Sequence, residues 1–243
     1  TASTADERLT SHDSIDFTFD ADTFNYNDVK IYVWAEDNSG NKVEENSAIT
    51  YSFGIDVTAP KIAVSYDNNS AQNEKYFKAD RTATIVVTER NFDPSNTKIN
   101  TQDAAAVSGW SYTRGSMANG DDDKWSCTVA YTKDGDYTFG ITTADLLGHD
   151  GGTPDYGSSV APTLFVLDKT KPTITISFDN NSVANGKYYN AHRTATVLVH
   201  EHNFSSEGAR VTATAQILEG TVDTPVAGTW RTVGDDNKAD VPF

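Results

Sequence analysis

The sequence is poor in several residue types, and each shortage excludes a class of protein. It has one cysteine, Cys127, in 243 residues, so an intrachain disulfide framework and a cysteine-based zinc site are both excluded. Basic side chains number 19 against 35 acidic ones, which gives a formal net charge of −16. Nucleic-acid binding needs clustered lysine and arginine to neutralise phosphates, so this charge argues against such a partner. No apolar run approaches the roughly 20 residues that a membrane-spanning helix needs.

Hydrophobic residues are also scarce, at 37 % of the chain, yet aromatic residues reach 11 %. Acidic disordered tails lack aromatic residues, so this composition indicates a folded protein with a small, aromatic-rich core. The chain has one methionine and starts at Thr1 without an apolar leader segment. We therefore expect a mature segment, or an excerpt of a longer protein.

The sequence repeats itself at an offset of 112 residues. Segment 56–93 aligns with segment 168–205 without a gap, and 21 of the 38 positions are identical, which chance cannot produce. The identities include the pattern Asp-x-Thr-x-Pro at 56–60 and the stretch Arg-Thr-Ala-Thr at 81–84. Such self-similarity at a fixed period is typical of repeated structural units.

Two further echoes extend the repeat. Segment 29–40 resembles segment 137–148 at an offset of 108, which places about four inserted residues after the second of them. More weakly, Trp110 and a following Gly-Asp-Asp-Asp-Lys stretch resemble Trp230 and a following Gly-Asp-Asp-Asn-Lys stretch. The repeat unit is therefore about 112 residues long, and the chain holds slightly more than two of them.

The Asp-x-Thr-x-Pro segments are best interpreted as linkers. Pro60 and Pro172 fix φ and cannot donate a hydrogen bond, so both are disfavoured inside a sheet. This frame predicts that 1–57 is the C-terminal part of one unit, 58–170 a complete unit, and 171–243 the N-terminal part of a further unit. A frame with two domains and permuted boundaries stays open.

Short alternating runs of apolar and polar residues dominate the sequence, and helical periodicity is almost absent. One run places Ile85 and Val87 on the same face of a strand. Clusters of turn-forming residues such as Asp-Asn-Asn-Ser at 67–70 separate these runs. Within 58–170 this spacing predicts an all-β fold, an antiparallel β-sandwich of about seven strands. Only Ala-Ala-Ala-Val at 104–107 hints at a helical turn.

Three motifs resemble a known family. They are Asp-Lys-Thr-Lys-Pro-Thr-Ile at 168–174, Arg-Thr-Ala-Thr at 81–84 and Ala-Asp-Leu-Leu-Gly at 144–148, and they are similar to bacterial immunoglobulin-like repeats. Such repeats stand in tandem in large secreted or wall-anchored surface proteins, many of them adhesins. The resemblance implies tandem Ig-like β-sandwiches, an extracellular setting and a spacer or display role. Its partners would be neighbouring repeats of the same polypeptide, and a host or glycan ligand stays open.

The repeat also tests candidate catalytic residues, because a catalytic group should occur once whereas a scaffolding group should recur. His200 and His202 would project to one face of a strand and could share a metal ion. Their counterparts in the other copy are Thr88 and Arg90, which cannot do so, and this favours a polar strand end. No nucleophile motif, phosphate-binding loop or distinct carboxylate pair occurs. We therefore expect a protein that is not an enzyme.

Calcium is the one ligand with a case in the sequence. Asp37 and Asp145 each stand in a loop followed by glycine, and Asp56 and Asp168 stand in the linkers. Calcium takes six to eight oxygen ligands, and an ion between a loop and a linker would stiffen the joint. The alternative, that these aspartates cap turns through their own backbone, stays open.

A second function is open because of paired aromatic residues. Tyr76 and Tyr188, with Phe77 and Tyr189 beside them, could form an exposed platform on which sugar rings stack. The chain would then be a carbohydrate-binding module of a secreted glycan-degrading enzyme. Otherwise, the alternate members of these pairs pack at the edge of the sandwich.

Overall fold

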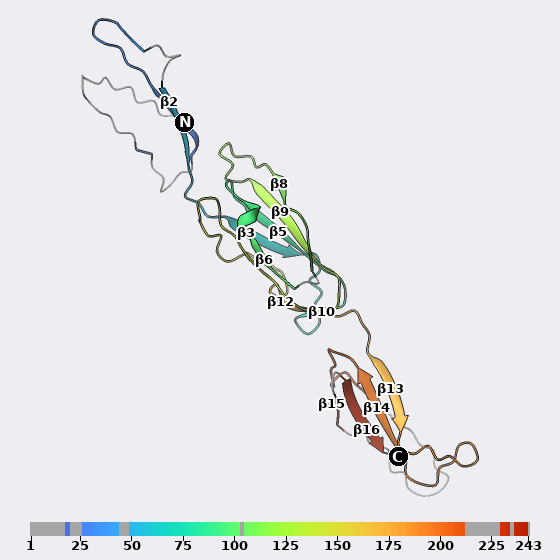
Figure 1. The fold of residues 1–243 in the computed structure, drawn as a ribbon. Coiled ribbons are helices and arrows are strands. Elements are labelled where there is room, and N and C mark those ends of the chain that lie inside the picture. The colour runs from blue at the N-terminus through green and yellow to red at the C-terminus, as the bar shows by residue number, and fades with distance from the viewer. Residues whose placement is uncertain are drawn as a thin grey trace. The chain divides into compact units, whose positions relative to one another are not determined.

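The fold was obtained as a computed structural model (Figure 1). It describes the residues 18–19, 26–43, 49–102, 105–211, 229–233 and 236–242. Within them the chain is nearly all β-structure in several antiparallel sheets, with one short 3-10 helix at Pro94–Asn96, which confirms the predicted all-β class. No described helix is long and apolar enough to span a membrane.

The chain divides into two compact units, Thr1–Leu167 and Asp168–Phe243, and each is described by itself. This division falls near the predicted linker at 168–172. The second predicted boundary, between residues 57 and 58, lies inside the first unit and stays a prediction.

The first layer of the first unit is a sheet with the order β3-β5-β9-β7, in which β8 also pairs with β9. Its strands are β3 (Lys61–Tyr66), β5 (Arg81–Thr88), β7 (Ala105–Val107), β8 (Ser111–Thr113) and β9 (Lys124–Tyr131). Burial alternates along β3 and β5, as the period of two predicts. The alanines of β7 pair with β9 and do not form the helical turn that their composition suggested, because strand pairing overrides a weak local preference.

The second layer consists of short strands that pack on the apolar face of the first. They are β4 (Tyr76–Phe77), β6 (Lys98–Asn100), β10 (Gly135–Thr138), β11 (Gly140–Thr142) and β12 (Leu164–Leu167). β12 pairs with β10 in antiparallel and with β4 in parallel orientation, and β11 pairs with β6.

Between residues 61 and 167 the described chain has ten strands, more than the seven or so expected. Several of them have only two to four residues, and the apolar run from Tyr137 to Ile141 is divided between β10 and β11. One hydrophobic core joins both layers, with buried side chains from β3, β5 and β9 on one side and from β4, β10, β11 and β12 on the other.

A buried guanidinium lies in this core. The Arg81 side chain is fully buried, and its Cζ lies 3.7 Å from the ring centroid of Tyr66, 4.1 Å from that of Phe77 and 4.5 Å from that of Phe165. The guanidinium donates hydrogen bonds to three backbone carbonyl oxygens, those of Asn68, Val160 and Ala161. Burial lowers the pKa of Arg81 to about 10, so the group still carries its charge at neutral pH. Aromatic faces and carbonyl dipoles therefore stabilise a cation inside the sandwich.

An antiparallel pair precedes the sandwich, formed by β1 (Tyr26–Val33) and β2 (Ile49–Ile55). In this pair Val29 lies opposite Phe53. The pair β10–β12 places Tyr137 opposite Phe165, which is the same register at the sequence offsets of 108 and 112.

The second unit contains one sheet of four strands. Its order is β13 (Thr173–Phe178), β14 (Thr194–His200), β16 (Asp236–Pro242) and β15 (Arg231–Val233). Ile174 pairs with Val199, as Ile62 pairs with Val87 in the first unit. The pairing register of this sheet is thus that of β3 and β5, displaced by 112 residues.

Candidate functional site

The linker between β2 and β3 is held by the side chain of Asp56. Its Oδ2 accepts a hydrogen bond from Asn91 Nδ2 at 2.6 Å and lies 3.4 Å from Arg90 Nη2. Its Oδ1 accepts from the backbone N–H of Thr58 at 3.1 Å. Arg90 Nη2 also donates to the carbonyl oxygen of Ile55 at 2.9 Å. The residues that follow β5 therefore bind the linker on both sides of Asp56.

The charges around this linker shift the pKa values of two carboxyl groups in opposite directions. Burial alone would raise the pKa of Asp56, but hydrogen bonds from Thr58 and Asn91 and the positive charge of Arg90 outweigh it and lower the pKa. Glu89 is buried and its Oε1 accepts from the backbone N–H of Asn91 at 2.8 Å. Burial raises the pKa of Glu89, and the nearby carboxylates of Asp56 and Asp145 raise it further.

The loop after β11 brings a second carboxylate to the linker. Asp145 is buried, and its Oδ1 accepts from the backbone N–H groups of Leu147 and His149 at 2.8 and 2.9 Å. Its Oδ2 lies 2.7 Å from His149 Nδ1. The loop closes through Gly148, whose φ of +91° suits glycine. The hydrogen bond to Asp145 is the main cause that raises the pKa of His149.

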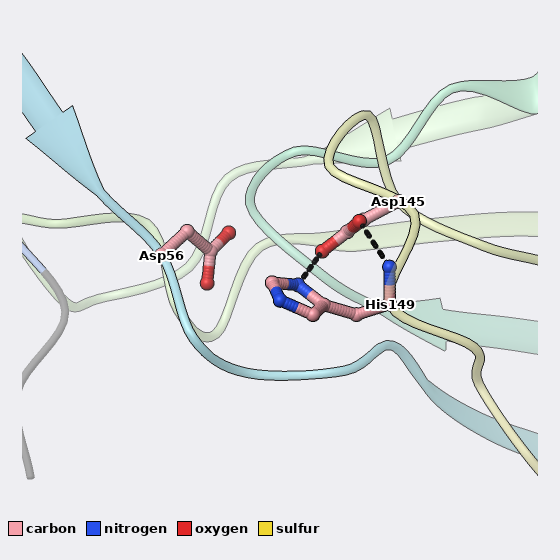
Figure 2. Close-up of side chains that lie close together, drawn as sticks. All are labelled: Asp56, Asp145 and His149. Atoms are coloured by element: carbon pink, nitrogen blue, oxygen red, sulfur yellow. Dashed lines mark hydrogen bonds and ion pairs between the residues drawn. The ribbon is translucent and has the colours of Figure 1, made fainter. Parts of the chain in front are cut away.

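Figure 2 shows that Asp56, Asp145 and His149 come together from two separate segments. Among the described residues they form the one group of three potential metal ligands whose ligand atoms all lie within 4.8 Å of one another. Two carboxylates and an imidazole could hold a divalent cation. In the geometry described here, their oxygens accept hydrogen bonds from the protein, so the same cluster also works as a clamp between loop and linker.

The sequence predicted Asp56 and Asp145 but missed His149. A signal for it exists in the loop of Asp37, whose Oδ1 accepts from the backbone N–H groups of Ser39 and Asn41 at 2.8 and 2.9 Å. Its Oδ2 accepts from Asn41 Nδ2 at 2.8 Å. Asn41 and His149 each follow their aspartate by four residues, so this position supplies the side chain that bonds the second oxygen.

Asp168 repeats the contacts of Asp56 within its own unit. Its Oδ2 accepts from Asn203 Nδ2 at 2.8 Å, and its Oδ1 accepts from the backbone N–H of Thr170 at 3.1 Å. The backbone N–H of Asn203 donates to Glu201 Oε1 at 2.9 Å. The structure thus brings Asp56 and Asp145 together, whereas Asp37 and Asp168 each bond residues of their own loop or linker.

Calcium binding by these four aspartates stays a prediction. A calcium titration of the whole chain that follows the unfolding midpoint tests it, because an ion at a hundredfold excess over its Kd stabilises the folded state by about 2.7 kcal/mol. The midpoint should respond in the parent chain and not in an Asp145→Asn variant.

A shallow hollow of about 280 Å³ lies beside the linker. It is lined by Gly54, Ile55, Asp56, Arg90, Asn91, Leu146 and Leu147. Pockets that bind substrates or cofactors commonly measure roughly 300–1,000 Å³ and are largely enclosed. The shape of this site therefore suits a structural joint better than a catalytic centre.

The tyrosines predicted to stack on sugars are placed differently from each other. Tyr76 is half-buried on β4, with Lys75 Nζ 5.4 Å from its ring centroid, while its neighbour Phe77 is buried in the core. Tyr188 is exposed, with Lys187 Nζ 5.3 Å from its ring centroid. A lysine thus lies over each ring, and sugar binding stays a prediction.

No protein-family model, curated protein or solved structure matches this chain. Its function is therefore argued from the geometry of the joint and from the path of the chain.

Proposed function

We propose that the chain is a non-enzymatic spacer, a run of tandem Ig-like sandwiches within a larger secreted or cell-surface bacterial protein that takes part in adhesion. The observation that carries the spacer role is that the backbone enters and leaves the sandwich of the first unit at opposite ends. The extracellular setting and the link to adhesion rest on the sequence motifs at 81–84, 144–148 and 168–174.

The register of the strands defines these two ends. β3 starts at Lys61, directly after the linker, and runs to Tyr66 at the far end of the sheet. Arg81, the first residue of β5, contacts the ring of Tyr66 and so marks that far end. β12 ends at Leu167, which pairs with Phe77, another ring against Arg81. A unit with this path adds its full length to an array, because the next unit continues from the far end.

The joint supports the same role. The linker at 56–60 is short, and Asp56 is bonded to Arg90 and Asn91 of the sandwich that follows it. The corresponding bond from Asn203 to Asp168 is present in the second unit. Hydrogen bonds to a charged carboxylate are stronger than neutral ones, so each linker is fixed to the unit it precedes. The net charge of −16 would keep neighbouring arrays apart in solution.

Force spectroscopy on the whole chain, tethered at its two ends, tests the proposal. The sandwich at 61–167 should open in a single step that releases between about 30 and 40 nm of chain, because each residue extends to about 3.6 Å. Asp56→Ala should leave the length of this step unchanged, since the core of the sandwich is intact. A gradual extension at low force without a discrete step would contradict a load-bearing spacer.

A further inference from the structure

The sheet of the second unit exposes the apolar face that the first unit covers. Ile174 and Ile176 on β13 are 64 % and 61 % exposed, whereas their counterparts Ile62 and Val64 on β3 are 5 % and 2 % exposed. Behind β13 an apolar groove of about 480 Å³ is open, with Trp230 among its lining residues. Exposed apolar surface of this kind marks an interaction site.

The first unit shows which structure covers such a face. There the pair β10–β12 contributes buried side chains to the same core as β3, β5 and β9, with Tyr137 and Phe165 among them. The pair β1–β2 has the register of β10–β12, with Phe53 in the place of Phe165. Phe53 and Tyr51 of this pair are exposed. The chain therefore carries an open sheet and, elsewhere, a strand pair of the type that closes it.

The guanidinium of Arg193 identifies the expected contact. Its Cζ lies 3.7 Å from the ring centroid of Phe178 and 4.1 Å from that of Tyr189, which reproduces two of the three rings around Arg81. The third ring around Arg81 belongs to Phe165 of β12. Among the described residues no third ring stands over Arg193, and Arg193 is only partly buried.

The strand pair cannot reach this sheet within its own chain. It is tied to the near end of the sandwich through the linker 56–60, whose five residues extend to at most about 18 Å. The open sheet follows β12, which ends at the opposite end of the sandwich. The partner must then be a second molecule.

We infer that two copies of this chain associate head to tail, with the β1–β2 pair of one copy covering the open sheet of the next and with Phe53 completing the ring cluster around Arg193. In the docked pair, β2 leads into the linker at 56–60 as β12 leads into the linker at 168–172. The contact is heterologous, so each copy offers one donor pair and one acceptor sheet, and the assembly grows as a linear series. This inference goes beyond the spacer role and does not depend on it.

Sedimentation of the whole chain over a wide range of concentration tests the inference. The parent chain should form a concentration-dependent series of multiples of its mass of 26.4 kDa. Phe53→Glu disables the donor and Ile176→Glu the acceptor, so each variant alone should stay at the mass of one chain. An equimolar mixture of the two should form dimers and nothing larger, because each copy retains one functional half. A parent chain that stays monomeric, or a mixture that does not dimerise, would overturn the inference.

Matched controls separate docking from misfolding. Ser52→Glu and Thr175→Glu place the same charge on the opposite faces of β2 and β13, and both should assemble like the parent chain. Each variant should also keep the thermal unfolding transition of the sandwich at 61–167. Loss of assembly in the controls would point to general aggregation and would count against the inference.

Disulfide trapping between two different chains tests the contact itself. The rings of Phe165 and Tyr66 lie 6.0 Å apart, so Phe53→Cys in one chain should lie close to Phe178→Cys in another. Under oxidation this pair should give a covalent dimer, and the pair Ser52→Cys with Phe178→Cys should give roughly tenfold less, because position 52 faces away. Equal yields from both pairs would overturn the proposed orientation. The force measurement on single tethered chains is unaffected by either outcome, so the two proposals fail independently.

Discussion

Arg81 and Arg193 have the same local sequence and different surroundings. Both donate Nε to the carbonyl oxygen of the residue at the start of an Asn-Asn-Ser turn, at 3.0 and 2.7 Å, and both stack on two rings. Only Arg81 gains a third ring and two further carbonyl acceptors, from residues 160–165. The comparison teaches that the turn and the first sheet set the side chain in place. Its burial depends on strands that lie some eighty residues further along the chain.

The joints at Asp56 and Asp168 differ in a similar way. Both aspartates accept from an asparagine and from the backbone N–H two residues further on. Asp56 is also paired with Arg90, where the second unit has His202. The hydrogen-bonded frame of the joint is thus common to both, and the ion pair belongs to the first.

The largest difference should appear when the same core position is truncated in both units. Phe77→Ala should lower the free energy of unfolding of the sandwich by about 3–5 kcal/mol, because it removes a fully buried ring. Tyr189→Ala should cost less than about half of that, since Tyr189 is only partly buried. Urea unfolding followed by far-UV circular dichroism measures both. Equal losses would break the distinction between a closed and an open unit.

Replacing the two arginines should give the next largest effect. Arg81→Met removes the cation and leaves three buried carbonyl oxygens with one partner fewer, so we expect a loss of about 3 kcal/mol in unfolding free energy. Arg193→Met should cost about 1 kcal/mol, because fewer groups lose a partner. Thermal unfolding of the two variants side by side checks the ratio, and a larger loss at position 193 would contradict it.

A smaller effect is expected at the joints. Asp56→Ala removes the acceptor for Asn91, Thr58 and Arg90 and should destabilise the sandwich by about 1–2 kcal/mol. Asp168→Ala should have a smaller effect, because it removes no ion pair of this kind. Hydrogen exchange at the N–H groups of Thr58 and Thr170 reports each joint separately. Unchanged protection of Thr58 in Asp56→Ala would show that the carboxylate does not hold the linker.

The smallest effect concerns pH. The pKa of His149 is raised in the folded state, so its contribution to stability is fully present below the ordinary pKa of about 6.5 and is lost as the pH rises through the folded value. Asp145 faces this ring, and Asp56, Glu89 and Arg90 surround it. With a chelator present, the melting temperature of the parent chain should therefore fall from pH 6 to pH 8 relative to that of His149→Gln. Parallel pH profiles would show that the Asp145 bond does not stabilise the protonated ring.

The all-β class and the linker positions were predictable because they depend on local patterns. Alternating runs such as 83–87 show which face of a strand is buried, and Pro60 marks a connector whatever the rest of the fold does. The repeat also pointed to Glu89 and Glu201, and their bonds to the backbone N–H groups of Asn91 and Asn203 are present. These contacts span two residues, so the sequence determines them locally.

The burial of Arg81 and the role of His149 were not predictable in the same way. An arginine is normally placed on the surface, and only its identity in both copies of the repeat marked it. The rings and carbonyls that bury Arg81 come from β3, β4 and β12, which local patterns do not bring together. His149 occurs once, and its echo at position 41 is an asparagine, so the shared bonding pattern became visible only in three dimensions.

The distance across the first unit tests the central claim most directly. Spin labels on Val57→Cys and Lys169→Cys in the whole chain report it, because Cys127 is buried and burial raises the pKa of its thiol to about 11, which leaves it unreactive. Strands of six to eight residues at about 3.3 Å per residue, with loops at both ends, predict a separation of roughly 40 Å. A single narrow distribution near that value is the expected result. A separation below about 20 Å would place both linkers at the same end of the sandwich and would contradict the spacer.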